Sequence, residues 1–502
     1  MQITLNNHPH RTTRKPIGGS NEVLSLNRDL GQHFTPASIC RMMMQHVPAV
    51  NPAVVTDLAM GQGELLWHAK QKWPYCQTVG FDIDSKLVKH CRSRLGLDGV
   101  YERMDVLKAS PLKARDRTIA HSLNGGVDVA LSNPPFGITP MKELEPTLSK
   151  MLNDHDLLFS NNGNGKLART EIAFFLRDLQ VISLEGYIAI LLPESAISGV
   201  KTQSFRGFLL NHTRLHLILS LPPNSFHSAE ARICLLVTQK KEHLVNKRIF
   251  VSIGIVDSKM KTVQTSKVEQ HRLVSRMDPK YCSRVVKLRR LTRGWKTLGD
   301  YVHDCSRGYG LYGSERSLLN TYGDLAYIHS INVANFTIST SPQQPTVPSS
   351  LAKHHPRALV HEKDVLLVRV GKGCIGRCAI ASKMSRDGFA SDCVYIIRSP
   401  RIDAYYLCLF LNTSFAKDYV NSCRRGVCSQ YITKPDVMAL PIFIPRVETI
   451  HKLSTAFRRI LDQIDCSDDT SQHILSLSLL TRQLDALIYE KRPIENDNYR
   501  LS

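Results

Sequence analysis

The sequence lacks the features that mark several classes of protein. No run approaches the ~20 apolar residues of a transmembrane helix, and no charged-then-apolar signal opens the chain. The thirteen cysteines form no CxxC pairs at zinc spacing, since the pairs in residues 374–378 and 423–428 are too far apart. Nuclease-like clusters of carboxylates with a lysine are also missing. We therefore expect a cytoplasmic protein with reduced thiols, no metal, no membrane contact and no cleavage activity.

Acidic residues are in short supply. The chain has 65 lysines and arginines against 44 aspartates and glutamates, which leaves a formal charge of +21 over 502 residues. Such an excess suits a polyanionic partner, because each neutralised phosphate releases counterions. Charge alone is equally compatible with DNA, with RNA or with a merely basic protein. The length allows two or three domains.

Residues 127–137, VDVALSNPPFG, combine an apolar run typical of a buried strand with Asn133, Pro134, Pro135 and Phe136. The Asn133 side-chain oxygen and the Pro134 carbonyl can both accept hydrogen bonds from one conjugated NH2 group. Accepting them together draws the nitrogen towards sp3 geometry and frees its lone pair for attack on a methyl donor. The prolines hold these acceptors in place, and Phe136 offers a face for a planar base. A strand that ends in a simple proline turn is the alternative.

Signals for a nucleotide-like cofactor lie upstream. Residues 53–58 predict a buried strand, and Gly61 and Gly63 follow it before a helical pattern begins. Asp82 ends the next strand about 20 residues later, at the spacing from which a carboxylate reaches ribose hydroxyls. Asp105 follows a third strand and could accept a hydrogen bond from an adenine amine. Each signal is weak alone, but their order before NPPF favours a cofactor site.

In this order the motifs resemble γ-class N6-adenine DNA methyltransferases, which include type I modification subunits and single-chain type II enzymes. GQHFTP at residues 31–36 is similar to the N-terminal segment of that family, and DLAMGQG at residues 57–63 to its glycine loop. Residues 219–241 resemble the segment that carries a base-stacking aromatic residue. The resemblance covers roughly residues 29–245. It implies an α/β, Rossmann-like domain with a mixed seven-stranded sheet and S-adenosyl-L-methionine as cofactor.

The resemblance also implies roles for single residues. The expected cofactor-binding residues are Phe34, Thr35, Pro36, Asp57, Gly61, Gly63, Asp82, Asp105 and Asn133. The expected catalytic residues are Asn133, Pro134, Pro135, Phe136 and Phe226. In this scheme a flipped-out base stacks between the two phenylalanines, which offsets part of a flipping cost of about a few kcal/mol.

From about residue 298 the pattern changes to many short strands separated by Gly, Pro and Ser. A glycine-rich turn in residues 361–382, a helix over 403–423 and a closing segment over 424–445 resemble, in this order, the target-recognition domain of type I specificity subunits. This resemblance implies an α+β recognition domain over residues 298–445. A helical segment follows over residues 446–502, either as a spacer or as a bundle that packs only on its own chain.

The remaining segments complete the expected division of the chain. We expect a flexible basic arm over residues 1–28, a catalytic domain over 29–280 and a basic linker over 281–297, which could follow a phosphate backbone or form a solvated helix face. Residues 161–166 predict a loop. The expected DNA-binding residues are Arg369, Lys372, Arg377, Arg424, Arg425 and Gln430. Most of the cations among them should contact phosphates.

The sequence thus predicts a site-specific methyltransferase that acts on N6 of a flipped-out adenine in duplex DNA, within a restriction-modification or related defence system. A homodimer, or a restriction or specificity subunit, is an open choice of protein partner. One alternative is a recognition or modification subunit that works only with partner subunits. Another is a methyltransferase for RNA adenine or protein glutamine, because a glutamine amide presents a similar conjugated NH2.

Overall fold

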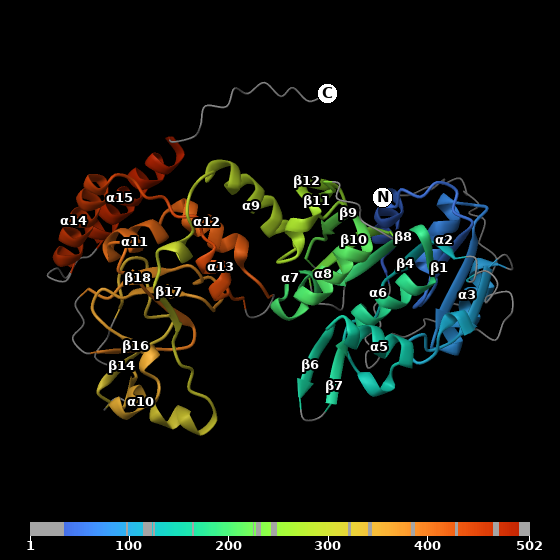
Figure 1. Ribbon diagram of the computed structural model, residues 1–502, viewed down its shortest axis with the longest axis horizontal. Coiled ribbons are helices and arrows are strands. Elements are labelled where there is room, and N and C mark those ends of the chain that lie inside the picture. The colour runs from blue at the N-terminus through green and yellow to red at the C-terminus, as the bar shows by residue number, and fades with distance from the viewer. Residues whose placement is uncertain are drawn as a thin grey trace, which may run out of the picture.

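A computed structural model describes most of the chain between Thr35 and Glu490. The described residues are 35–96, 99–113, 123, 126–162, 165–223, 225–226, 232–241, 248–319, 323–339, 344–382, 387–426, 430–464 and 471–490. The expected basic arm and Phe34 lie outside them. Figure 1 shows two lobes side by side, with the N-terminal half of the chain in one and the C-terminal half in the other. Among the described helices, none is both long and apolar enough to cross a membrane.

A mixed sheet forms the centre of the N-terminal lobe, in the order β12-β11-β9-β10-β8-β4-β1-β2-β3. Its strands are β1 (Val54–Asp57), β2 (Gln77–Asp82), β3 (Gly99–Arg103), β4 (Val127–Ser132), β8 (Ile182–Pro193), β9 (Thr213–Ser220), β10 (Ile233–Lys240), β11 (Phe250–Val256) and β12 (Thr262–Glu269). Strand β10 is antiparallel to both of its neighbours, whereas β1, β2, β3, β4 and β8 are parallel.

This α/β architecture agrees with the expected fold class, but the sheet has nine strands rather than seven. The difference is the pair β11 and β12, which adds to the edge at β9. Strand β11 is mostly buried and packs against helix α9 (Pro279–Leu291), so the extra pair extends the sheet beyond β9 and leaves β12 as its edge strand.

Helices cover both faces of this sheet. One face carries α1 (Ala37–His46), α2 (Glu64–Lys72) and α3 (Ser85–Leu95), and the other carries α5 (Pro146–Asp154), α6 (Thr170–Val181) and α8 (Gln203–His212). Along β8, Ala189 and Leu191 belong to the first core. Their neighbours Ile188 and Ile190 belong to the second. Because the central strands are buried on both faces, they appear in the sequence as continuous apolar runs.

A small three-stranded sheet follows the NPPF motif. It consists of β5 (Ile138–Pro140), β7 (Gly165–Arg169) and β6 (Leu158–Asn162), in that order. Most of the expected loop over residues 161–166 therefore belongs to a β-hairpin, whose tip at residues 163–164 lies outside the described part of the chain. In Figure 1 this hairpin projects from the lower side of the N-terminal lobe.

The C-terminal lobe combines two four-stranded sheets with helices. The first sheet is β13 (Asp304–Arg307), β20 (Val394–Arg398), β17 (Val365–Val368) and β18 (Cys378–Ile380), and the second is β15 (Thr346–Val347), β14 (Leu325–Ile328), β19 (Gly388–Ala390) and β16 (Leu359–Val360). The helices are α10 (Ser349–His354), α11 (Ala404–Leu411), α12 (Ser414–Cys423), α13 (Lys434–Met438), α14 (Val447–Ile464) and α15 (Ser471–Glu490).

The structure refines two expectations for this lobe, one for the helix over residues 403–423 and one for the helical tail that follows residue 446. The helix expected over residues 403–423 is split into α11 and α12, because the Thr413 side chain accepts a hydrogen bond from the Ala416 amide and begins a new helix. Helices α14 and α15 pack on each other and on α11 and α12, in one apolar core with the first sheet. The tail thus buries its apolar stripe on its own chain.

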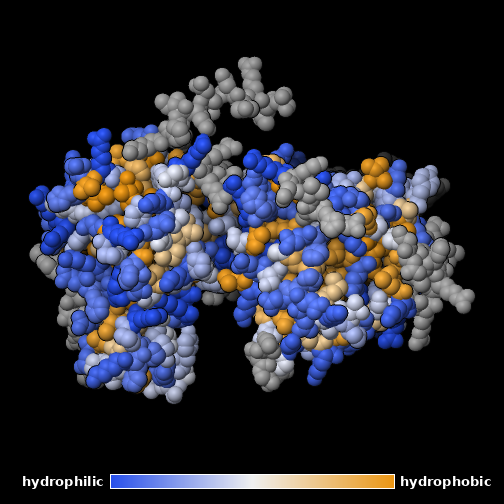
Figure 2. All heavy atoms as spheres, viewed as in Figure 1, coloured by the Kyte–Doolittle hydropathy of each residue, from blue (hydrophilic) through white to orange (hydrophobic). Residues whose placement is uncertain are grey.

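Helix α9 joins the two lobes. It occupies much of the expected basic linker, and it contacts β11 and β12 of the N-terminal lobe and α12 of the C-terminal lobe. Tyr281 on this helix packs against the apolar cores of both lobes. The linker is therefore a shared structural element. Below the junction the molecule is hollowed between the lobes, and Figure 2 shows mostly hydrophilic side chains along that gap.

Candidate active site

The glycine loop lies between β1 and α2 and is held by two carboxylates. Asp57, the last residue of β1, is buried, and its Oδ1 accepts a hydrogen bond of 3.0 Å from the Ala59 amide. Asp82, the last residue of β2, accepts from the Gly61 amide at 3.0 Å. Gly61 and Gly63 have φ values of 53° and 76°, which are strained for other residues. The loop geometry therefore depends on both aspartates and both glycines.

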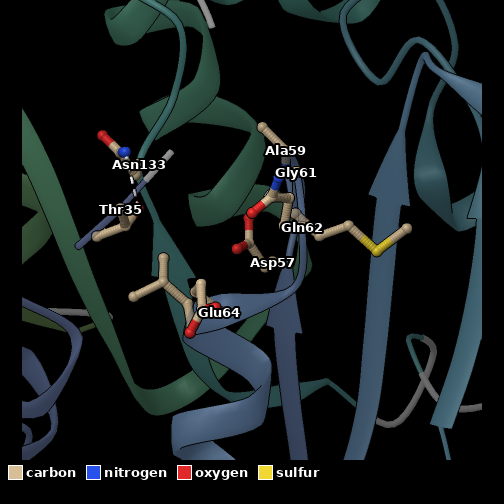
Figure 3. A pocket seen from close by; sticks show the side chains of 9 residues that line it. Thr35, Asp57, Ala59, Gly61, Gln62, Glu64 and Asn133 are labelled. Atoms are coloured by element: carbon tan, nitrogen blue, oxygen red, sulfur yellow. Dashed lines mark hydrogen bonds between the residues drawn. The ribbon is translucent and has the colours of Figure 1, made fainter. Parts of the chain in front are cut away.

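A pocket opens beside this loop (Figure 3). It is lined by Thr35, Asp57, Ala59, Met60, Gly61, Gln62, Glu64, Leu65 and Asn133. Thr35 and Asn133 meet at one side of it, where Nδ2 of Asn133 donates a hydrogen bond of 2.8 Å to Oγ1 of Thr35. The pocket therefore brings together Thr35 of the GQHFTP motif, the glycine loop and Asn133 of the NPPF motif, which are far apart in the sequence.

The two aspartates give the pocket an unusual electrostatic character. Burial raises the pKa of Asp57 to about 7, the Ala59 amide opposes this shift, and the charge of Asp82 adds to it. Burial likewise raises the pKa of Asp82, although the amides of Asp84 and Gly61 donate hydrogen bonds to it. A ligand that brings hydroxyl donors or a positive charge would favour the ionised carboxylates. The donor set thus fits a cationic, ribose-containing cofactor.

Other expected cofactor residues lie at the margin of this site. Pro36 immediately precedes α1, and its carbonyl accepts hydrogen bonds from the amides of Ile39 and Cys40. Asp105 follows β3, and its Oδ1 accepts from the Leu107 amide at 3.1 Å. With 39% of its side chain exposed, Asp105 remains accessible to a ligand, but it does not line the pocket beside the glycine loop.

The NPPF motif follows directly after β4. Asn133, Pro135 and Phe136 are half-buried and Pro134 is buried. Phe136 packs against the apolar cluster that contains Phe226, which is 5% exposed. The structure therefore places both expected stacking residues at the same core.

Two charged residues that the sequence analysis missed fix the chain beyond this motif. Glu171 in α6 is fully buried, accepts a hydrogen bond of 3.4 Å from the Gly137 amide, and pairs with Arg169. Nη2 of Arg169 donates to Oγ of Ser195 at 3.0 Å. The sequence signal was a lone glutamate at the start of the apolar run TEIAFF. Its burial anchors the residue that follows Phe136.

Asp178 is a second buried acid in α6 that was not anticipated. It lies beneath the sheet and is 0% exposed. Burial raises its pKa well above the usual value, while Ser132 lowers it and the charge of Asp57 raises it further. Asp178 lies below the residue that precedes Asn133.

The expected DNA-binding residues fall into two groups. Lys372 and Arg377 are exposed in the turn between β17 and β18. Gln430 is half-buried, and its carbonyl accepts a hydrogen bond of 3.2 Å from the Gly371 amide, so it lies against the same turn. These three residues are placed where a ligand can reach them.

The other three are engaged within the protein. Nη1 of Arg369 donates to the carbonyl of Asp392 at 2.8 Å, and Nη2 of Arg424 donates to the carbonyl of Ile375 at 3.1 Å. Arg425 differs from the expectation: it is 7% exposed, pairs with Asp436 at 2.8 Å, and donates to the carbonyl of Ser198. Because Ser198 belongs to the N-terminal lobe and Asp436 to the C-terminal lobe, Arg425 joins the two lobes.

Comparisons with known proteins agree with the motif order. The family model described as N-6 DNA Methylase matches residues 24–284 of the 502. The methylase subunit of the type I restriction enzyme MpnII of Mycoplasma pneumoniae is 25% identical over 223 residues, which cover 42% of this chain and 40% of that protein. This chain thus spans well under half of that curated relative.

Similar solved structures include two larger proteins. The type IIG restriction endonuclease BpuSI aligns with 92% of this chain and 66% of its own, at 14% identity and a TM-score of 0.43. DrdV, solved in a complex with DNA, aligns with 86% of this chain and 57% of its own, at 10% identity and a TM-score of 0.46.

Proposed function

Because the chain belongs to the N-6 DNA methylase family, we propose that it transfers a methyl group from S-adenosyl-L-methionine to N6 of an adenine in duplex DNA. The observation that carries this proposal is the hydrogen bond between Asn133 and Thr35. It joins the motif suited to an aromatic amine with a pocket whose carboxylates suit a cationic nucleoside. Both halves of a methyl-transfer site therefore meet at one residue.

The cofactor would supply an electrophilic methyl group when bound. Asp57 and the glycine loop would hold its amino-acid part, since their pocket also contains Thr35. Asp82 would accept hydrogen bonds from its ribose hydroxyls, and Asp105 from its adenine amine. Asp82 ends β2 and Asp105 follows β3, and these two strands lie next to each other, parallel, on one side of β1, so both carboxylates lie along the same end of the sheet.

The NPPF residues would prepare the target amine. The side-chain oxygen of Asn133 and the carbonyl of Pro134 would accept its two hydrogens and localise the lone pair on the nitrogen, while Phe136 and Phe226 would hold the flipped base by stacking. The bond from Asn133 Nδ2 to Thr35 sets the orientation of this amide. No general base is needed before transfer, because the proton leaves once the nitrogen carries positive charge.

The C-terminal lobe would read the DNA sequence. The gap between the lobes lies between the hairpin β6–β7 and the sheets of the C-terminal lobe (Figure 1), and the exposed turn with Lys372 and Arg377 would contact DNA. We propose a role in a restriction-modification or related defence system. A specificity or restriction subunit, or a second copy of this chain, would complete recognition of a two-part site.

Methyl transfer from labelled S-adenosyl-L-methionine to plasmid DNA tests this function. The expected product is N6-methyladenine at one short sequence, identified by mass spectrometry and mapped by single-molecule sequencing. Asn133→Ala is the matched inactive control. Transfer to RNA or to protein glutamine in place of DNA would contradict the substrate assignment. Absence of transfer until a specificity subunit is added would show that the chain works as one subunit of an assembly.

A further inference from the structure

A second cavity lies at the junction of the two lobes. The N-terminal lobe lines it with Pro193, Glu194, Ser195, Ser198, Gly199 and Arg232, and the C-terminal lobe with Arg425, Gly426 and Tyr431. It begins where β8 ends, and β8 pairs with β4, which leads into the NPPF motif. In Figure 1 the neighbouring helices α7 (Glu194–Ser198) and α13 lie above the gap between the lobes.

A short chain of contacts joins this cavity to the target motif. Ser195 in the cavity wall accepts the hydrogen bond from Arg169, and Arg169 pairs with Glu171. Glu171 in turn accepts from the amide of Gly137, the residue after Phe136. A group bound in the cavity would therefore lie close to a base held at the NPPF motif.

Basic residues outnumber acids around this junction. The basic residues are Arg206, Arg232, Arg276, Lys280, Arg424 and Arg425, and the carboxylates that act on them are those of Glu194, Asp278 and Asp436. Burial raises the pKa of Glu194, and the nearby charge of Asp278 adds to this shift.

Three of the arginines are used within the protein. Arg276 pairs with Asp278 and donates to the carbonyls of Cys423 and Arg424. Arg425 is held by Asp436 and by the Ser198 carbonyl. Arg206 donates to the carbonyls of Gly199, Val274 and Ser275. These contacts occupy most of the donors of the three arginines.

Arg424 donates to the carbonyl of Ile375, which leaves Arg232 and Lys280. Arg232 is 28% exposed, and its nearest carboxylate, Glu194, is 3.9 Å away, beyond hydrogen-bond distance. Lys280 is exposed, and within the described part of the chain its ammonium group has neither a hydrogen bond nor an ion pair. Partial desolvation of its ammonium group lowers the pKa of Lys280, and repulsion from Arg232 and Arg424 lowers it more than Glu194 and Asp278 raise it. The local potential is therefore positive, and a bound anion would relieve the repulsion.

We propose that Arg232 and Lys280 bind a phosphodiester of the DNA strand that carries the target adenine. The arginine fork suits two phosphate oxygens, and the lysine adds a compact charge. An enzyme that flips a base must hold the backbone beside it, and phosphate contacts set the register of DNA on a protein. This inference rests on the proposed function, because it assigns the backbone contact that accompanies flipping.

Further cations continue this positive surface towards the hairpin. Lys201, in the turn after α7, and Arg169 lie 5.1 Å and 5.7 Å from the centre of the Phe159 ring on β6. Lys201 is exposed. Arg169 is paired with Glu171, so the exposed Lys201 is the cation that extends positive charge from the domain junction towards the base of the hairpin.

The test compares Arg232→Gln, Lys280→Gln and the double variant with the full-length parent chain. Duplex DNA affinity is measured by fluorescence anisotropy between about 50 and about 200 mM salt. Loss of this one phosphate contact should reduce the slope of log Kd against log salt by roughly 0.9 in the double variant, and each single variant should lose part of that amount. Arg232→Lys keeps the charge and should retain the parent slope.

Lys261→Gln is the matched control, because Lys261 is an exposed lysine in the turn between β11 and β12, at the edge of the sheet. Its slope should match that of the parent. Cofactor affinity by calorimetry shows that each variant is folded. An unchanged slope in the double variant with normal cofactor affinity overturns the proposal, as does a reduced slope seen with RNA and not with duplex DNA. A parent chain that binds duplex DNA without methylating it would refute the proposed function alone.

Discussion

Asn133 and Thr35 form a hydrogen bond of 2.8 Å across 98 positions of sequence. The amide of Asn133 belongs to the NPPF motif, and the hydroxyl of Thr35 belongs to the segment that precedes α1. Because this bond uses the donor end of the amide, it orients the oxygen of the same amide as an acceptor. Thr35 therefore positions the asparagine to which we assign the target amine.

Thr35→Val tests this positioning. The substitution keeps the shape of the side chain and removes the acceptor of the Asn133 amide, so we expect kcat to fall roughly five- to tenfold, as for a loss of about 1 kcal/mol of hydrogen bonding. Thr35→Ser should restore the rate, since it returns the hydroxyl. Equal kcat values for the parent and Thr35→Val, measured at saturating DNA, would contradict the role.

Asn133→Ala should have a much larger effect. It removes the side-chain acceptor of the target amine, and loss of one preorganised polar group typically lowers kcat by about 100- to 1,000-fold. Cofactor affinity should change little, because Asp57 and the glycine loop stay in place. Single-turnover methylation and calorimetric cofactor binding separate the two effects. A variant with near-normal turnover would refute the proposed mechanism.

The parts of the site that the sequence predicted are those encoded locally. Asn133 follows an apolar strand, and Gly61 lies in a turn between a strand and a helix, so a short window shows both the residue and its element. Fold class follows for the same reason, since buried parallel strands appear as apolar runs. The strand pair β11–β12 was missed because the number of seven strands came from the family resemblance, and this pair lies beyond the strands it includes.

Residues whose partners are distant in sequence could not be assigned in this way. Arg425 resembles a DNA-binding arginine in its basic context, but its environment is set by Asp436 and by Ser198, which is 227 positions away. The role of Glu171 depends on the Gly137 amide, 34 positions away. A sequence shows that such charges exist, whereas only the fold shows which of them are already paired.

The raised pKa of Asp57 predicts a pH-dependent cofactor affinity. With a pKa of about 7 in the free protein, Asp57 is largely protonated below that pH and must lose its proton to accept the donors of a cationic ligand. Affinity should therefore rise between about pH 6 and about pH 8, with proton release on binding. Calorimetry in buffers of different ionisation enthalpy measures both. Asp57→Asn should bind more weakly and abolish the pH dependence.

The raised pKa of Asp57 also determines how the stability of the folded protein changes with pH. A carboxyl whose pKa is higher in the folded than in the unfolded state stabilises the protein fully below about pH 4, and this contribution is lost as the pH rises through about 7. The cofactor-free protein should thus gain thermal stability from Asp57→Asn at pH 8 and gain little at pH 5. An equal gain at both values would contradict the raised pKa.

Arg425 and Asp436 should affect stability more than DNA affinity. Asp436→Ala leaves the buried guanidinium of Arg425 without its carboxylate, and removing one partner of a buried pair costs about 3–5 kcal/mol. Arg425→Met with Asp436→Leu removes both charges and should destabilise the protein less than Asp436→Ala does. Thermal unfolding compares Asp436→Ala, Arg425→Met and the double variant with the parent. If Arg425→Met instead kept full stability and reduced the salt dependence of DNA binding by one phosphate contact, the arginine would be a DNA ligand, as its basic sequence context suggested.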